Sequence, residues 1–236
     1  MIISIFVFLV ILTLSIPAAI LFIPLALITG KMGPLYAVTN FIVRAGFAAA
    51  GIRIQVEGRE LVPAGRACIF MANHVSNLDP PALISHLPSR TAAFTKRSVM
   101  NIPVFGYCLK LGQFIPVDRD GSVSGAQASI AAAHKVIESG LHITTFVEGT
   151  RSRDGRMLPF KKGPFYLAQE TAAPCIPVSI YGTETLMAKG SFAIKPGRVH
   201  IVFHAPIDPR DYASRDELSA AVRAAIASGL PEWMRN

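Results

Sequence analysis

Charged side chains are absent from the first 30 residues of this 236-residue chain, which excludes an ordinary solvent-exposed helix there. Only Ser4, Thr13, Ser15, Pro17 and Pro24 interrupt the apolar run Ile2–Ile28. As a helix the run would reach roughly 40 Å, more than a hydrocarbon core of roughly 30 Å. Because each proline removes a helical hydrogen bond, the run fits either a spanning helix or one that dips into a single leaflet. It lacks the basic start of a cleaved signal peptide.

Cysteine is scarce as well. Cys68, Cys108 and Cys175 lie far apart in apolar stretches. An odd and scattered set of this kind excludes a disulfide framework and a cysteine-based zinc site. We expect three reduced side chains in the core of one domain, because 236 residues suit a single well-buried domain with a short appendage.

Acidic residues are outnumbered, with 15 Asp and Glu against 23 Lys and Arg and a net charge of +8. A basic chain attracts nucleic acid or an anionic membrane surface. The apolar N-terminus favours the membrane, so we expect a phospholipid bilayer as partner and no nucleic acid. The first charges after the apolar run are Lys31, Arg44 and Arg53. All three are basic, which predicts attachment to the inner membrane with the bulk of the chain on the cytoplasmic face.

The pattern of apolar residues changes at Gly51. Residues 31–50 are still largely apolar and predict a second helix, so we expect a membrane-associated helical hairpin over 1–50 and a catalytic domain over 51–236. The later part alternates helical stretches at 123–139 and 214–228 with β-branched runs at 52–56, 67–72, 143–147, 176–180 and 199–203. This alternation predicts an α/β fold, with a mostly buried mixed sheet flanked by helices.

The first segment that can carry chemistry is Asn73-His74-Val75-Ser76-Asn77-Leu78-Asp79. It follows an apolar strand and precedes Pro80, so Asp79 is predicted to cap a helix that begins at Pro80. Ligand sites of open α/β sheets form at such strand ends. An Asp five residues from His74 can fix the imidazole tautomer and leave the other ring nitrogen as a base. Two alternatives stay open: a purely structural loop, and a metal site that adds Glu148.

The second segment, Phe146-Val147-Glu148-Gly149-Thr150-Arg151-Ser152, also follows an apolar strand. Gly149 allows a ligand to approach the backbone, and Arg151 offers a planar fork for phosphate. A polar turn with a solvated Arg151 is the alternative, but it leaves the clustering of donors unexplained. A third segment, from Gly112 to Arg119, predicts a short strand whose last residue is a second candidate phosphate ligand.

Together these segments resemble the glycerolipid acyltransferase family, whose best-known members are the bacterial 1-acylglycerol-3-phosphate acyltransferases. The family's Asn-His-x4-Asp motif is matched by Asn73, His74 and Asp79, and its Phe-x-Glu-Gly-Thr-Arg-Ser motif by residues 146–152. Its Gly-to-Arg strand is matched at 112–119, and its proline-containing apolar strand at 175–178. The resemblance covers about half of the chain, from Ala67 to Ile180.

The resemblance implies a role for each matched residue. His74 would be the general base and Asp79 its positioning partner. Six residues would contact the substrates: Lys96, Arg119, Glu148, Gly149, Thr150 and Arg151. Of these, Arg119 and Arg151 would bind the acceptor phosphate, and the Gly149 N–H is a possible oxyanion donor. The resemblance implies no metal and no cofactor, with acyl-CoA or acyl carrier protein supplying the acyl group as co-substrate.

The implied reaction is acyl transfer to the sn-2 hydroxyl of 1-acylglycerol-3-phosphate, which makes phosphatidic acid in phospholipid biosynthesis. Another lysolipid acceptor, such as a lyso-ornithine lipid, is an open alternative, because the motifs report the reaction more than the head group. A non-catalytic lipid-binding protein and a lipid hydrolase are rivals from other classes. The choice between the two thioester donors, the acyl length and the oligomeric state are left open by the sequence.

Overall fold

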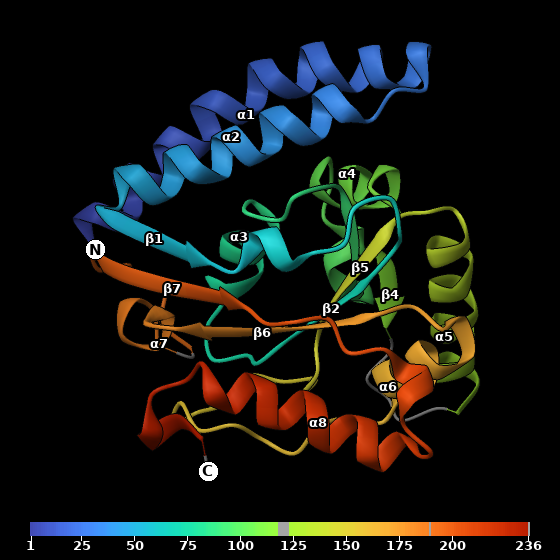
Figure 1. The fold of residues 1–236 in the computed structure, drawn as a ribbon. Coiled ribbons are helices and arrows are strands. Elements are labelled where there is room, and N and C mark those ends of the chain that lie inside the picture. The colour runs from blue at the N-terminus through green and yellow to red at the C-terminus, as the bar shows by residue number, and fades with distance from the viewer. Residues whose placement is uncertain (118–122, 189, 236) are drawn as a thin grey trace.

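The structure is a computed structural model that describes residues 1–117, 123–188 and 190–235. Within them the side chains of Val123, Ser124 and Ala126 are left undescribed. A central sheet is covered by helices on both faces, and a long helical hairpin lies across one side of the molecule (Figure 1). Arg119, one of the predicted phosphate ligands, lies outside the described residues.

The sheet has seven strands in the order β1-β7-β6-β2-β5-β3-β4. β6 and β7 are antiparallel, and every other neighbouring pair is parallel. The predicted mixed sheet is therefore confirmed. The strands are β1 (Ile52–Glu57), β2 (Ile69–Ala72), β3 (Thr91–Lys96), β4 (Ile115–Val117), β5 (His142–Phe146), β6 (Cys175–Tyr181) and β7 (Gly197–Phe203).

The helices cover both faces of this sheet. Their bounds are α1 (Ile2–Thr29), α2 (Gly33–Ala49), α3 (Asp79–Ile84), α4 (Phe105–Leu111), α5 (Val123–Glu138), α6 (Gly163–Thr171), α7 (Thr183–Leu186) and α8 (Arg215–Ser228). Short 3-10 turns lie at η1 (Arg59–Leu61), η2 (Arg97–Asn101), η3 (Pro209–Asp211) and η4 (Glu232–Met234). The predicted helices at 123–139 and 214–228 are present, and Ser214 caps α8 by accepting a hydrogen bond from the Glu217 N–H.

Side chains alternate between two apolar cores because successive residues of a strand point to opposite faces. On β2, Ile69 and Met71 enter the core beneath α5, α6 and α8. Phe70 and Ala72 enter the core beneath α3 and the hairpin. β2 lies between β6 and β5 and is buried on both faces, so the loop that follows it starts from a rigid position.

The hairpin packs through a close approach of its two helices. α1 continues through Pro17 and Pro24 without a break. A Cβ placed on Gly46 of α2 would lie 3.0 Å from the Cδ1 atom of Ile11 on α1. The missing side chain at this glycine therefore allows the two helices to pack closely.

The hairpin lies along the α/β domain instead of projecting from it. On α2, the Tyr36 hydroxyl donates to the Ile84 carbonyl at 3.3 Å, and the Arg44 Nε donates to the Ser85 carbonyl at 2.9 Å. At the N-terminal end of α1, the Ser4 hydroxyl accepts a hydrogen bond from the Ile194 N–H at 2.9 Å. Both helices are thus fixed to the domain at several points.

The outer surface of α1 is apolar and uncovered. α1 is long and apolar enough to cross a membrane, by length and composition alone, and only 6% of its most apolar window is buried in the protein. It is therefore not the core helix of a soluble domain, and it is a candidate membrane segment.

We expect Gly46→Val to disrupt the hairpin, because the added side chain must displace Ile11 from the α1–α2 contact. The thermal midpoint of the detergent-solubilised protein should fall, and protease cleavage at the turn between the helices should become faster. Gly33→Val in the same hairpin is the matched control, because nothing lies within 4 Å of a Cβ there. Equal effects of the two substitutions would contradict the close packing at Gly46.

Candidate active site

The predicted motifs meet at one edge of the sheet. β2 and β5 are parallel neighbours, with Ala72 opposite Phe146, so the loops that follow them leave the sheet side by side. The His74 ring lies 4.3 Å from the Phe146 ring, measured between centroids and tilted by 30°. The Ser152 N–H donates to the His74 carbonyl at 2.9 Å. The sheet therefore joins two segments that are more than 70 residues apart in the chain.

The predicted hydrogen bond between His74 and Asp79 is present. Nδ1 of His74 lies 2.8 Å from Oδ2 of Asp79. Because the carboxylate faces Nδ1, this nitrogen carries the proton in the neutral ring, and Nε2 on the far side of the ring is left as the base. The Asp79 side chain is fully buried, while 15% of the His74 side chain is exposed. Reactants can thus reach the imidazole but not the carboxylate.

Asp79 is held by its own loop and by α7. Its Oδ2 atom accepts hydrogen bonds from the backbone N–H groups of Val75 at 2.7 Å and Ser76 at 2.8 Å. Its Oδ1 atom accepts a hydrogen bond from the Thr183 hydroxyl. The prediction that Asp79 caps the following helix is wrong, because Leu78 is the N-cap of α3 and makes no side-chain cap. The carboxylate folds back onto its own loop instead of forward onto the helix.

The sequence did not indicate the contacts of three residues that hold the His74 loop in place. The Asn73 side chain, fully buried, donates to the Ile180 carbonyl and accepts from the Ile180 N–H, both at 2.8 Å. The Ser76 hydroxyl donates to the Met187 carbonyl at 2.8 Å. Thr183 provides the donor to Asp79. Asn73 lies within the recognised motif, but Thr183 is more than 100 residues away, and nothing in the local sequence around it indicates the contact.

Glu148 supports the histidine loop. Its Oε1 atom accepts the His74 N–H at 3.1 Å, and its Oε2 atom accepts the Leu158 N–H at 3.2 Å. The residue is 1% exposed, and burial raises the pKa of Glu148 to about 7 against the opposing effect of these two donors. Each oxygen of this side chain, which was predicted to contact the acceptor, accepts one backbone hydrogen bond. The carboxylate fixes the backbone at His74.

Gly149 and Thr150 form the exposed turn after β5. Gly149 has φ 67°, in the left-handed region, and a Cβ there would lie 3.1 Å from Cγ of Lys161. Its N–H donates to the Phe146 carbonyl at 2.9 Å. This N–H, a possible oxyanion donor by the sequence, closes the turn in the structure. Gly149 is needed for the backbone conformation.

The remaining predicted contacts are basic. Lys96 is exposed at the end of β3, and Arg151 is partly buried directly after the turn. β3 pairs with β5 in parallel, so both strands end on the same edge of the sheet as the His74 loop. Two basic residues therefore follow or end strands at the edge of the sheet where the His74 loop lies.

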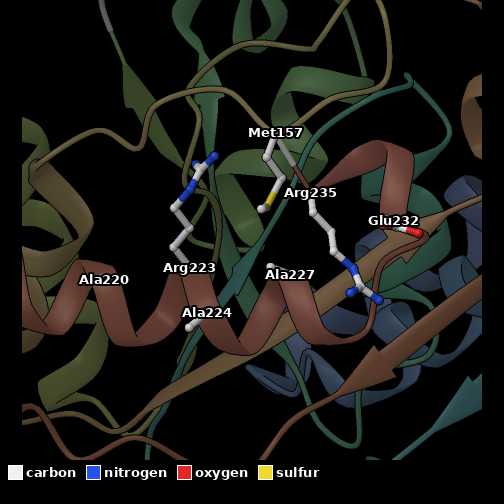
Figure 2. Close-up of a pocket in the computed structure, with 7 residues that line it drawn as sticks. All are labelled: Met157, Ala220, Arg223, Ala224, Ala227, Glu232 and Arg235. Carbon is white, nitrogen blue, oxygen red and sulfur yellow. The ribbon is translucent and has the colours of Figure 1, made fainter.

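A separate hollow of about 560 Å³ has Met157 but not His74 among its lining residues (Figure 2). Figure 2 shows Arg223 and Arg235 at this hollow, which α8 and the C-terminal segment line. Arg223 donates to the Leu158 carbonyl at 2.9 Å, and its guanidinium lies 5.2 Å from the centre of the Phe160 ring. Arg223 thus holds the backbone at Leu158, the residue whose N–H donates to Glu148.

The cysteines offer no nucleophile at this site. All three are free thiols. Burial raises the pKa of Cys68 to about 11 and that of Cys175 to about 12, which keeps both thiols protonated and unreactive. Among the described residues, no group of three or more His, Cys, Asp or Glu side chains is arranged to hold a metal ion.

Comparisons with known proteins agree with the motifs. The chain is 33% identical over 162 residues to a 1-acyl-sn-glycerol-3-phosphate acyltransferase of Limnanthes douglasii, an alignment that covers 69% of the chain and 57% of the relative. The corresponding enzyme beta of Homo sapiens is 30% identical over 142 residues, with 60% of the chain and 51% of the relative covered. The chain thus spans little more than half the length of these curated relatives.

A solved structure matches almost the whole chain. The crystal structure of the 1-acyl-sn-glycerophosphate acyltransferase PlsC from Thermotoga maritima superimposes with a TM-score of 0.82 at 26% identity, covering 98% of this chain and 95% of the other. The model of the Acyltransferase family matches residues 53–181, more than half of the chain and all of the His74 and Glu148 loops. The chain belongs to the acyltransferase family that its motifs predicted.

Proposed function

We propose that the protein transfers a fatty acyl group from a thioester donor, acyl-CoA or acyl carrier protein, to the sn-2 hydroxyl of 1-acylglycerol-3-phosphate. The observation that carries this proposal is the His74–Asp79 pair, held at 2.8 Å with Nε2 directed away from the buried carboxylate. The named activity of the relatives supports the choice of acceptor.

The imidazole would move one proton in each half of the reaction. Nε2 of His74 takes the proton from the acceptor hydroxyl while its oxygen bonds to the thioester carbonyl carbon. The tetrahedral intermediate then breaks its C–S bond, and the imidazolium returns the proton to the departing sulfur. Asp79 stabilises the imidazolium through Nδ1, and hydrogen bonds from two backbone N–H groups and the Thr183 hydroxyl hold its carboxyl group in place.

The acceptor phosphate would bind the basic side chains at the same edge. Arg151 follows the Gly149 turn, and Lys96 lies at the end of the adjacent β3. A guanidinium and an ammonium offer several donors to a phosphate dianion. Arg119 stays a predicted third ligand. Glu148 would act through the His74 backbone, since its two oxygens already accept backbone hydrogen bonds.

The hairpin would attach the protein to a single leaflet, with the domain on the cytoplasmic face of the inner membrane. α2 contacts the domain at Tyr36, Arg44 and Phe47, and α1 contacts it near Ser4. A hairpin fixed along a water-exposed domain can offer lipid only its outer, apolar face. This arrangement favours the dipping geometry over the spanning one and brings the domain to the leaflet that contains a lysolipid acceptor.

His74→Ala should lower kcat by about 100-fold to 10,000-fold, because it removes the general base. Asp79→Ala should leave a small residual rate, because an unsupported imidazole can still accept a proton. The measurement is thiol release from acyl-CoA and acyl carrier protein by detergent-purified protein, with lysophosphatidic acid, a lyso-ornithine lipid and no acceptor as parallel arms. Acceptor-independent release would indicate a hydrolase. No thiol release in any arm would indicate a lipid-binding protein. A rate unchanged in His74→Ala would contradict the proposed base.

Thr183→Val should lower kcat roughly 10-fold with little change in KM for either substrate, because a buried carboxylate loses a hydrogen bond of about 1.5 kcal/mol or more. Thr183→Ser retains the hydroxyl and should recover most of the rate. Valine has nearly the shape of threonine, so thermal midpoints for both variants separate a loss of positioning from a loss of folding. A Ser variant as slow as the Val variant would refute the role of the hydroxyl.

Glu148 should make the fold less stable as the pH rises. The folded protein retains the proton of Glu148 up to a pKa of about 7, whereas the unfolded chain loses it near 4.5. The unfolded state therefore binds fewer protons between these values, and the free energy of unfolding falls across this interval. Glu148→Gln cannot ionise, so the thermal midpoint of the wild type relative to this variant should be higher at pH 5 than at pH 8. An equal difference at both pH values would contradict the shift.

A further inference from the structure

Four large apolar side chains of the catalytic domain form an exposed patch that is separate in sequence from the hairpin. This patch, the α4 tip, consists of Ile102, Val104, Phe105 and Tyr107, which are 49%, 61%, 53% and 45% exposed. They lie between Ile102, the C-cap of η2, and Tyr107, in the first turn of α4. Clusters of adjacent exposed apolar side chains mark interaction sites, whereas single ones are ordinary surface.

The backbone that presents the tip is closed and strained. The Gly106 N–H donates to the Ile102 carbonyl at 2.7 Å. A Cβ on Gly106 would lie 2.0 Å from the Met100 carbonyl oxygen, so only glycine fits there. Val104 has φ 62°, a left-handed conformation that β-branched residues rarely adopt. Strain of this kind is retained where it presents functional groups, and here it accompanies side chains that point into solvent.

The tip lies on the same side of the molecule as the hairpin. Figure 1 shows α4 near the hairpin at the top of the domain, while α6 and α8 cover the opposite side. In this view α4 lies on the side of the domain that faces the hairpin, and α8 lies on the opposite side.

The segments that contain the hairpin and the tip are also basic. Residues 1–56 and 80–117, which include the hairpin and the tip, contain no Asp or Glu. The same segments contain Lys31, Arg90, Lys96, Arg97 and Lys110, all exposed. Arg97 and Lys110 line a hollow of about 350 Å³ beside α4. Apolar side chains bordered by basic ones match the acyl boundary and the phosphates of an anionic leaflet.

We propose that the α4 tip is a second membrane contact, which inserts into the same anionic leaflet as the hairpin. This inference rests on the proposed attachment of the hairpin. One contact fixes the distance of a domain from a bilayer but leaves its tilt free, whereas two separated contacts restrict the tilt. The tip would thus fix the height of the His74 loop above the leaflet that holds the acceptor.

The test uses the single tryptophan of the chain. Trp233 lies in η4, near the C-terminus, and Figure 1 shows the C-terminal end of the chain on the side away from the hairpin. In a Trp233→Phe background, Phe105→Trp places a probe on the tip, and Leu9→Trp places one on the exposed face of α1. Each full-length protein is reconstituted into phosphatidylcholine–phosphatidylglycerol vesicles, with and without brominated acyl chains that quench tryptophan on contact.

We expect brominated lipid to quench the Phe105→Trp and Leu9→Trp variants to a similar degree and to leave Trp233 of the wild type unquenched. Quenching at Leu9→Trp alone would overturn the tip contact while the hairpin attachment stands. Absence of quenching at both positions would overturn the attachment itself. Thermal midpoints and thiol release of each variant confirm that the fold is retained.

The anionic part of the proposal has its own measurement. Lys110→Gln should raise the lipid concentration at half-maximal vesicle binding about fivefold when phosphatidylglycerol is present, and leave it unchanged with phosphatidylcholine alone. Lys135→Gln on α5 is the matched control, because it removes one exposed lysine away from the tip. An equal effect of both substitutions would mean that only net charge matters and would refute a localised contact.

Discussion

The hydrogen bonds to the Asp79 carboxylate organise the catalytic edge of this protein. One buried side chain accepts from two backbone groups of its own loop, from Thr183 and from the histidine. A buried carboxylate is stable as an anion only with several donors, so the loop after β2 must close around it and α7 must lie against it. The direction of the His74 ring follows from that closure.

Glu148 also holds the His74 loop, from the loop that follows the neighbouring strand β5. By accepting the His74 N–H it joins the loop after β5 to the loop after β2, and by accepting the Leu158 N–H it joins both to the segment that Arg223 braces. The two motifs that define the family are thus parts of one hydrogen-bonded unit. Its polar groups are buried between two apolar cores, where each lost partner is costly.

The local signals in the sequence were sufficient for most of the architecture. The buried runs at β1, β2, β5, β6 and β7 were recognisable because β-branched and apolar residues cluster there, and α8 because Ser214 and its apolar spacing mark a helix start. β3 was not among the predicted strands, since Thr91–Lys96 holds two alanines and ends on a lysine. Asp79 was misread as a cap because a carboxylate before proline has that use in isolation.

The sequence by itself determined which two motif segments follow buried strands, the class of the fold and the apolar character of the N-terminus. These follow from residue type and short-range spacing, which act within a few positions of the chain. Only the tertiary structure decided that Thr183 holds Asp79, that Glu148 supports a backbone group instead of a ligand, and that the hairpin lies along the domain. Each of these contacts joins segments about 40 to more than 100 residues apart, which meet only because the sheet order places their strands and helices side by side.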